Sequence, residues 1–284
     1  MSKSKRDLVK ELSINPEVVT GLITQFMRQQ FHQTGLQKGI LGLSGGVDSS
    51  VVAALAVRAL GCQNVIAFLL SSDTTAAEDL NDAEELANML NIQVQKFEIT
   101  PLLKLLEEKL VGHPDRLRRG NLMARLRMTI LYDQAKYHSA LVLGTSNKTE
   151  ILLGYFTLWG DAAADLKPIG DLYKTQVLQL AEYLNIPRRI INKPPTAGLW
   201  VGQTDEEELG YRYREIDQLL YFLIEGQGSL IQAQKLGFDE KLISDVIQRI
   251  RHYAFKRQPV PVAKLNRTSI WQSFQILDCV DFNR

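Results

Sequence analysis

Apolar residues along this chain show two kinds of spacing, and segments of the two kinds alternate. Short, nearly continuous apolar runs are typical of parallel strands that are buried on both faces. Between and after these runs, apolar residues recur three and four positions apart, which predicts amphipathic helices. The runs lie at residues 40–43, 64–70 and 140–144, and we expect a further strand over residues 93–99. This alternation predicts an α/β fold: a Rossmann-like, open, mainly parallel sheet with helices on both faces.

The other segments are helical or irregular. Helical spacing predicts helices at residues 16–33, 121–138, 173–184, 209–224 and 239–255. Residues 112–120 are polar and rich in turn-forming residues. Residues 192–207 contain two adjacent prolines and two glycines with almost no apolar periodicity, so we expect a long loop there. Long loops inside compact domains are usually functional or disordered.

No stretch has the composition of a linker between domains. We therefore expect a single domain over residues 1–284. Its nucleotide-binding α/β core would span about residues 35–190, and a flap loop with C-terminal helices would span about residues 191–284.

The first predicted strand ends at a glycine pair, and a helical pattern begins at once. The segment is Leu41-Gly42-Leu43-Ser44-Gly45-Gly46-Val47-Asp48-Ser49-Ser50. Because glycine adopts backbone angles closed to other residues, the amides of Gly45 and Gly46 can converge on one point. Unpaired N–H groups and the positive end of the helix dipole favour phosphate at that point. The sequence therefore predicts a phosphate-binding turn, to which serine hydroxyls add donors.

Asp48 is the most informative residue of this turn. A carboxylate inside a phosphate site repels its ligand unless a divalent cation lies between them, so the sequence implies Mg²⁺. The turn differs from the Gly-x-x-x-x-Gly-Lys-Ser/Thr loop of kinases and GTPases, because it is shorter and no lysine follows the second glycine. A plain strand-to-helix turn of a Rossmann-like fold is the alternative interpretation.

Composition narrows the class of protein. With 45% hydrophobic and 23% charged residues, the chain has ordinary proportions for a soluble globular enzyme. A net charge of +1 provides no general attraction to nucleic acid or to a membrane, so we expect neither as a partner. Residues 2–10 are polar, and no apolar run approaches the roughly 20 residues of a membrane span, so we expect neither signal peptide nor anchor.

Cysteine and histidine indicate no metal site. Cys62 and Cys279 lie far apart and form no Cys-x-x-Cys pair. The four histidines have no zinc-binding spacing; they are His32, His113, His138 and His252. A reducing cytoplasm fits this cysteine usage best.

The glycine turn resembles the Ser-Gly-Gly-x-Asp-Ser signature of the N-type ATP pyrophosphatases, which cleave ATP between the α and β phosphates and attach AMP to a substrate oxygen. Further segments from about residue 35 to 261 resemble NAD synthetase, the ATP-dependent enzyme that amidates deamido-NAD. They are Asn121-x-x-Ala124-Arg125-x-Arg127-Met128, Gly144-Thr145-Ser146-Asn147-Lys148-Thr149-Glu150, Gly154-Tyr155-Phe156-Thr157, Gly160-Asp161 with Asp165, Lys167-Pro168-Ile169-Gly170-Asp171-Leu172-Tyr173-Lys174-Thr175-Gln176, Pro195-Thr196-Ala197-Gly198-Leu199, Gly202-Gln203-Thr204-Asp205-Glu206, Glu208-Leu209-Gly210-Tyr211 and Lys256-Arg257. Their joint occurrence in the order of that family is very specific, and it implies an adenine nucleotide alpha hydrolase-like fold.

The resemblance implies a two-step amidation. ATP converts the nicotinate carboxylate of deamido-NAD (nicotinate adenine dinucleotide) into an acyl adenylate and releases pyrophosphate. Ammonia then expels AMP to give NAD. The implied enzyme is an ammonia-dependent NAD synthase, EC 6.3.1.5, with ATP as co-substrate and Mg²⁺ as cofactor.

The resemblance also implies roles for particular residues. Asp48 and Glu150 would ligate Mg²⁺, and Asp48 and Lys174 would be catalytic. Asp161 is the candidate for the ammonia step, because a buried carboxylate can attract ammonium and help to remove a proton. The ATP-binding set is Gly42, Leu43, Ser44, Gly45, Gly46, Val47, Asp48, Ser49, Thr145, Lys174 and Thr196. The set for deamido-NAD is Arg125, Asp165 and Lys256.

The residue types alone leave other interpretations open. Glu150 and Lys174 are also typical of solvated charges on helix surfaces. Asp161 is equally typical of a turn or cap aspartate beside Gly160. We expect three of the five arginines in one basic cluster to be solvated; the cluster is Arg116, Arg118, Arg119, Arg125 and Arg127.

Two positions depart from the small bacterial members of the family. Leu158 stands where those carry a substrate-binding lysine, so we assign it no substrate role, and Phe255 precedes Lys256 where they carry histidine. The segment Tyr155-Phe156-Thr157-Leu158-Trp159 is more similar to the synthetase half of glutamine-dependent members. The chain has no room for their additional amidohydrolase domain. We therefore expect free ammonia, or ammonia from a separate glutaminase partner, as the nitrogen source.

The family resemblance further implies a homodimer with the deamido-NAD site near the subunit contact. The helices predicted at residues 16–33 and 121–138 are candidates for that contact, and packing in the core of one subunit is the alternative. We expect the loop at residues 192–207 to close over ATP and the adenylate, because closure excludes water that would hydrolyse the intermediate.

Two other functions stay open at this point. One is a different ATP pyrophosphatase, either a GMP-synthetase-like amidase or a tRNA-modifying ligase. The near-neutral charge and the lack of a basic appended domain disfavour tRNA. The other is a nucleotide-binding regulator with degenerate catalysis, which the intact Asp48, Glu150 and Lys174 disfavour.

Overall fold

The computed structural model describes residues 5–112, 114–200, 202–265, 267 and 270. His113, Cys279 and the start of the polar N-terminal segment lie outside the described residues. Cys62 is a half-buried free thiol. Among the helices formed by described residues, none combines the length and apolar character that a membrane crossing requires.

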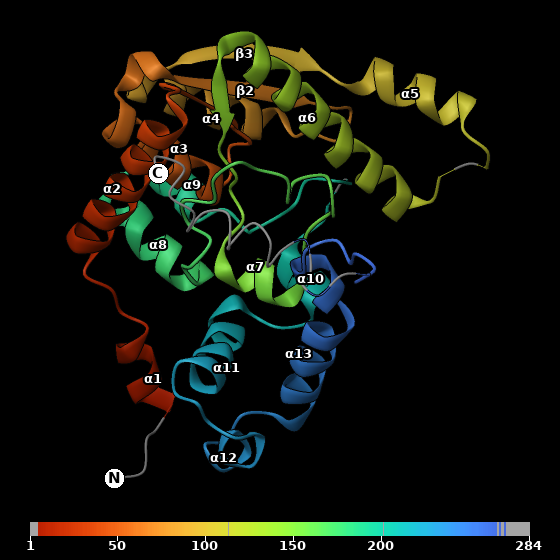
Figure 1. The fold of residues 1–284 in the computed structure, drawn as a ribbon. Helices are drawn as coiled ribbons and strands as arrows, with labels where there is room; N and C mark the ends of the chain where they lie inside the picture. The colour runs from red at the N-terminus through yellow and green to blue at the C-terminus, as the bar shows by residue number, and fades with distance from the viewer. Residues whose placement is uncertain (1–4, 113, 201, 266, 268–269, 271–284) are drawn as a thin grey trace.

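A four-stranded parallel sheet forms the centre of the fold (Figure 1). The strands are β1 (Lys38–Gly42), β2 (Val65–Ser71), β3 (Gln93–Glu98) and β4 (Ala140–Val142), in the spatial order β3-β2-β1-β4. In register, Ile40 of β1 lies beside Ile66 of β2 and Val142 of β4. The predicted α/β fold with a parallel sheet is therefore confirmed.

Side chains of β1 and β2 alternate between two apolar layers. Leu41 and Leu69 pack on one face of the sheet, whereas Ile40 and Phe68 pack on the other. The first face is covered by α2 (Pro16–Thr34), α3 (Val47–Leu60), α4 (Ala77–Leu90) and α8 (Lys174–Tyr183). The second face is covered by α5 (Thr100–Lys109) and α6 (Arg116–His138). β1, β2 and β4 are largely buried and read as short apolar runs, whereas the edge strand β3 is mostly exposed and carries polar residues.

A separate apolar cluster joins the two ends of the chain. Leu8 and Leu12 pack with the C-terminal helices, and Figure 1 shows α1 beside α11. The helices of this layer are α1 (Lys5–Glu11), α7 (Lys148–Leu153), α10 (Asp205–Leu209), α11 (Tyr213–Ile224), α12 (Leu230–Lys235) and α13 (Glu240–His252). Short helical connections are η1 (Cys62–Asn64), α9 (Arg188–Ile191) and η2 (Ala254–Arg257). Since α11 contacts both α7 and α8, this layer supports the core from one side.

Three local boundaries differ from the prediction. Helix α6 begins within the segment that was expected to form turns, because the Asp115 carboxylate accepts a hydrogen bond from the Arg118 amide (2.8 Å) and caps the helix. The helix expected over residues 209–224 is divided, because Gly210 has a φ of +81° and ends α10. Since α10 begins at Asp205, the irregular loop is also shorter than expected.

The turn between β1 and α3 requires glycine at Gly45. This residue has a φ of +78°, and a Cβ there would lie 2.2 Å from the Asp79 carbonyl oxygen. We expect Gly45→Ala to lower the free energy of unfolding by about 2 kcal/mol or more. Gly21→Ala, in α2 with open space around it, is the matched control and should raise that free energy by about 0.5–1 kcal/mol. Urea denaturation measures both variants, and equal stabilities would contradict this close approach.

Candidate active site

A large pocket opens at the carboxyl ends of the strands. Its volume is about 690 Å³, a size typical of small-molecule sites. Gly42 of β1, Leu70 of β2 and Val142 of β4 reach it, while α6 and the loop residues 193–200 form its walls. This is the edge of the sheet at which ligands bind in open parallel α/β folds.

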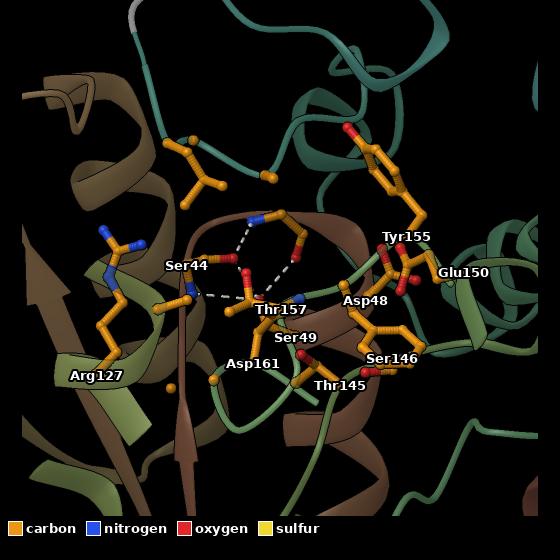
Figure 2. A pocket seen from close by; sticks show the side chains of 18 of the residues that line it. Ser44, Asp48, Ser49, Arg127, Thr145, Ser146, Glu150, Tyr155, Thr157 and Asp161 are labelled. Carbon is orange, nitrogen blue, oxygen red and sulfur yellow. Dashed lines mark hydrogen bonds between the residues drawn. The ribbon is translucent and has the colours of Figure 1, made fainter. Parts of the chain in front are cut away.

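Serine side chains hold the glycine turn at this edge. The Ser44 amide donates to Ser49 Oγ (3.2 Å), and the Gly46 amide donates to Ser44 Oγ (3.3 Å) (Figure 2). The Ser49 hydroxyl donates to the Gly46 carbonyl (3.0 Å). Helix α3 starts at Val47, so the positive end of its dipole faces the pocket. The amides of Ser44 and Gly46 are thus engaged by serine hydroxyls, and what the turn presents to the pocket is the N-terminus of α3.

The residues predicted to bind ATP converge on this pocket. Thr145 follows β4, Thr196 belongs to the long loop and Lys174 begins α8. Gly45 does not line the pocket, since it packs against Asp79. The residues of the turn that line it are Gly42, Leu43, Ser44, Gly46, Val47, Asp48 and Ser49.

A buried ion pair lies at the centre of the site. Lys174, only 2% exposed, pairs its ammonium with the Asp48 carboxylate. The other Asp48 oxygen accepts a hydrogen bond from Asn147 Nδ2 (2.9 Å). Burial lowers the pKa of Lys174, but the carboxylates of Asp48 and Glu150 outweigh this effect, so the pKa lies above its ordinary value. Lys174 is therefore charged at neutral pH, and it is not a solvated surface lysine.

Glu150 faces the same pair from the first turn of α7. Burial raises the pKa of Glu150 well above its usual value, and the charge of Asp48 raises it further. Glu150 Oε2 accepts a hydrogen bond from the Asn147 amide (3.2 Å), and the Glu150 amide donates to Asn147 Oδ1 (3.0 Å). This capping box fixes the start of α7 and aims Glu150 at Asp48.

Asp205, at the start of α10, adds a third carboxylate. It is 4% exposed, and its oxygens accept hydrogen bonds from the hydroxyls of Tyr155 (3.2 Å) and Tyr213 (3.0 Å). Burial raises the pKa of Asp205, although Lys174 and these hydroxyls oppose the rise. The sequence segment that contains Asp205 was recognised, but no role was predicted for the residue.

These side chains carry more negative than positive charge. The carboxylates of Asp48, Glu150 and Asp205 surround the ammonium of Lys174, and a divalent cation would balance the excess. Among the described residues, no group of three or more carboxylate, imidazole or thiol side chains could hold a metal by itself. Mg²⁺ commonly binds one or two protein carboxylates together with water and phosphate oxygens. The donor set at Asp48 and Glu150 fits that preference.

Asp161 lines the pocket on a turn that follows α7. Its Oδ1 accepts a hydrogen bond from the Thr157 amide (2.9 Å). The side chain is accessible from the pocket, yet surrounding protein atoms reduce its hydration and raise the pKa of Asp161. Asp161 therefore accepts a hydrogen bond within a turn, as the alternative interpretation expected, and its carboxylate also lines the pocket.

Two of the three residues predicted to contact deamido-NAD line the pocket. The exposed Arg125 guanidinium lies 3.4 Å from the carbonyl oxygen of Leu158. Lys256 donates to the carbonyls of Gly154 (2.8 Å) and Phe156 (2.6 Å). Its ammonium therefore already supports the pocket wall.

The third residue, Asp165, does not line this pocket. It is exposed, and its Oδ2 accepts a hydrogen bond from the Val142 amide (2.8 Å), while Oδ1 lies 3.3 Å from the Tyr132 hydroxyl. A ligand that touches both Asp165 and the pocket would have to extend beyond it.

Arg127 is a pocket residue that the sequence did not single out. Its Nε donates to the Leu70 carbonyl (3.0 Å), and Figure 2 shows the guanidinium across the view from Asp48 and Glu150. Burial lowers the pKa of Arg127, although Asp161 is close enough to oppose this. Arg127 and its neighbours in the basic cluster have the same side chain, so only the fold distinguishes them.

The long loop contacts the glycine turn and α6. Lys193 Nζ donates to Asp79 (2.7 Å), pairs with Asp82 and lies 3.4 Å from the Gly45 carbonyl oxygen. On the other side of the pocket, the Arg116 guanidinium lies 4.3 Å from the centre of the Trp200 ring. The loop is thus a formed wall of the pocket.

Asp217 of α11 lies behind the ion pair and is fully buried. Its oxygens accept hydrogen bonds from the Thr149 hydroxyl (2.6 Å) and the Thr175 amide (2.8 Å). Burial raises the pKa of Asp217 to about 6, because these hydrogen bonds offset only part of the lost hydration. The only trace of this site in the sequence is an acid on the otherwise apolar face of a helix.

The fold and the pocket define this chain as an α/β nucleotide-binding protein whose phosphate-binding turn carries its own acid. Comparison with known proteins then identifies the family: the NAD synthase family matches residues 19–260. The chain belongs to the NAD synthase family.

Relatives and solved structures agree with this assignment. The chain is 42% identical over 269 residues to the NH₃-dependent NAD⁺ synthetase of Trichlorobacter lovleyi, covering 94% of this chain and 97% of the relative. It is similar to the solved NMN synthetase of Francisella tularensis, with a TM-score of 0.80 and 34% identity over 89% of this chain and 100% of that one. It is also similar to the NH₃-dependent NAD synthetase of Campylobacter jejuni, with a TM-score of 0.76, 32% identity and the same coverage.

Asp217 should make the free energy of unfolding depend on pH. Its folded pKa of about 6 lies above the ordinary value of 3.8, so between these pH values the folded state binds more protons. The contribution of Asp217 to the free energy of unfolding should therefore fall, by about 3 kcal/mol, as the pH rises from 3.8 to 6. We expect Asp217→Asn to remove this slope. Urea denaturation at several pH values measures it, and parallel profiles for variant and wild type would contradict the raised pKa.

Proposed function

We propose that the pocket around Asp48 synthesises NAD⁺ from deamido-NAD and ammonia, with ATP as co-substrate and AMP and pyrophosphate as products. The observation that carries this proposal is the convergence of Asp48, Glu150 and Lys174 beside a phosphate-binding turn. Relatives about 42% identical to this chain are named NH₃-dependent NAD⁺ synthetase, and the corresponding reaction is EC 6.3.1.5. In this proposal, residues 1–284 form a single NAD synthetase domain.

The need for ATP follows from the chemistry of the acceptor. A nicotinate carboxylate is negative and has a poor leaving group, so ammonia does not attack it. Adenylation neutralises the carboxylate and supplies AMP as the leaving group. Lys174 would donate to phosphate oxygens on which charge develops as the α–β bond breaks, and the hydroxyls of Thr145 and Thr196 would add donors.

Asp48 and Glu150 would hold Mg²⁺ together with phosphate oxygens of ATP. When bound, the metal neutralises phosphate charge and stabilises the leaving pyrophosphate. Asn147 would keep both carboxylates in place, since it donates to Asp48 and caps the helix of Glu150. Lys174 would hold the Asp48 carboxylate through their ion pair.

Asp161 is our proposed base for the ammonia step. Ammonium is the dominant species near neutral pH and is not a nucleophile, so a proton must leave before attack. The Asp161 side chain is exposed to the pocket, but surrounding protein atoms raise its pKa, and a carboxylate with a raised pKa is a stronger base, which suits Asp161 to accept that proton.

Deamido-NAD would contact Arg125 and Lys256 inside the pocket and Asp165 outside it. We propose a homodimer that extends the binding surface beyond one subunit. The apolar residues Val18, Leu22 and Phe26 support a contact through α2, because they are 54%, 62% and 41% exposed along one side of that helix. We further propose a cytoplasmic enzyme that takes free ammonia or ammonia from a separate glutaminase.

A second acceptor also fits the comparisons. The solved structure with a TM-score of 0.80 is named an NMN synthetase, and a nicotinate mononucleotide carries the same carboxylate as the dinucleotide. The exposed position of Asp165, outside the pocket, favours the longer dinucleotide here.

Purified protein with ATP, Mg²⁺, ammonium and either deamido-NAD or nicotinate mononucleotide tests the proposal. We expect NAD and AMP in equal amounts, with the dinucleotide preferred. ADP and orthophosphate as products would contradict it, as would AMP formation only with a different acceptor. Lys174→Met should lower kcat by about 100- to 1000-fold. Lys148→Met is the matched control, because Lys148 is likewise the first residue of its helix but pairs with Glu225 outside the pocket. Its kcat should stay near that of the wild type.

Asp161→Asn should separate the two half-reactions. We expect amidation to fall by about 100-fold or more, because the base is lost, while adenylation changes little. Exchange of labelled pyrophosphate into ATP without ammonium measures adenylation, and NAD formation measures the sum. Asp171→Asn, whose side chain is 96% exposed, is the control. Equal loss of both half-reactions in Asp161→Asn would reject the assignment.

A further inference from the structure

The helices that carry Glu150 and Lys174 begin beside each other. Glu150 is the third residue of α7, and Lys174 is the first residue of α8. Helix α11 of the C-terminal layer contacts both helices. The buried carboxylate of Asp217, on α11, lies where their first turns meet.

A chain of buried hydrogen bonds connects the two first turns. The Lys174 amide donates to Thr149 Oγ1 (3.0 Å), and the Thr149 hydroxyl donates to Asp217 Oδ1 (2.6 Å). The Thr175 amide donates to Asp217 Oδ2 (2.8 Å). Thr149 and Asp217 have no exposed surface. Each oxygen of Asp217 thus holds one helix, at the residue next to Glu150 on α7 and next to Lys174 on α8.

Packing alone does not explain a carboxylate at this position. The other buried residues around it on α11 include Ile216, Leu219 and Leu220, and an apolar side chain would fill the same space. Burying an ionised group costs free energy unless hydrogen bonds and nearby charges compensate. Here the compensating groups are the Thr149 hydroxyl, the Thr175 amide and the ammonium of Lys174, all of which belong to the catalytic side of the molecule.

We propose that Asp217 is a positioning residue that fixes the first turns of α7 and α8 relative to each other. It would do so through Thr149 and the Thr175 amide, so that Glu150 and Lys174 meet Asp48 and the phosphates in one arrangement. This inference rests on the proposed roles of Glu150 and Lys174. It predicts that the ATP half of the reaction depends on a residue that touches no substrate, and that the deamido-NAD half does not.

Three variants test the connection. Asp217→Asn places an amide where both helices need acceptors, Thr149→Val removes the hydroxyl between α7 and Asp217, and Thr149→Ser keeps it. Leu219→Ala is the matched control, because it weakens the same helix in its apolar core without touching these hydrogen bonds. All are compared at a temperature where circular dichroism shows each protein to be folded. Thr149→Val carries the test alone if Asp217→Asn does not fold.

Two measurements distinguish positioning from stability. Steady-state kinetics give kcat and the KM values for ATP and deamido-NAD. Calorimetry gives the affinity for α,β-methylene-ATP with Mg²⁺, which does not depend on turnover.

We expect Asp217→Asn and Thr149→Val to lose 10- to 100-fold in kcat or in affinity for the ATP analogue, with the KM for deamido-NAD nearly unchanged. Thr149→Ser should recover most of the loss. The double variant that combines Asp217→Asn with Thr149→Val should lose no more than about twofold beyond the worse single variant, because both changes break the same chain of hydrogen bonds. Leu219→Ala should lose stability but keep kcat.

Equal kcat together with equal affinity for the ATP analogue in Asp217→Asn, Leu219→Ala and wild type would overturn the inference, and so would a loss confined to deamido-NAD binding. Glu150→Gln and Lys174→Met are measured alongside, because they distinguish failure of the proposed function from failure of the positioning role of Asp217. If these two stay active, the proposed function fails. If they lose activity while Asp217→Asn does not, only the positioning role fails.

Discussion

The site depends on one interaction, the buried pairing of the Lys174 ammonium with the Asp48 carboxylate. The ammonium of Lys174 is almost completely buried, so it needs a carboxylate beside it to compensate for its lost hydration. The pair places an acid at the turn that begins α3 together with a positive charge. Glu150 and Asp205 add two more carboxyl groups, whose pKa values burial raises, so the charge balance of the site shifts toward negative when a divalent cation stabilises their ionised forms. Every assigned role of the pocket, from phosphate binding to bond cleavage, depends on this balance.

The fold was largely predictable, because its signals are local. Continuous apolar runs marked the strands, and the glycine pair marked the turn at which Gly45 approaches Asp79. The errors lie where one side chain decides a boundary. Asp115 caps α6 earlier than the polar composition suggested, and Gly210 divides a helix whose apolar spacing continued across it.

The site was predictable only where residues follow a strand or belong to a recognised segment. Asp48, Glu150 and Lys174 were named in advance, and the structure brings all three to one pocket. Asp217 lies outside every such segment, and Arg127, although it lies in one, received no role. Their importance comes from contacts between residues far apart in the chain, such as Asp217 with Thr149, 68 positions away. No local pattern encodes such a contact. Helical spacing predicts apolar residues on a buried helix face, so it does not predict a buried acid there.

The apolar cluster that joins Leu8 and Leu12 to α11 has a consequence for how the protein is made. These residues are synthesised more than 200 residues ahead of their partners on α11 and α13. Contacts this distant in sequence are slow to form, and domains fold as their parts become available during synthesis. The α/β layers can assemble early, whereas Asp205 and Asp217 arrive with the late helices. The pocket and its acidic side chains are therefore completed late, when Leu8 and Leu12 pack against the C-terminal helices.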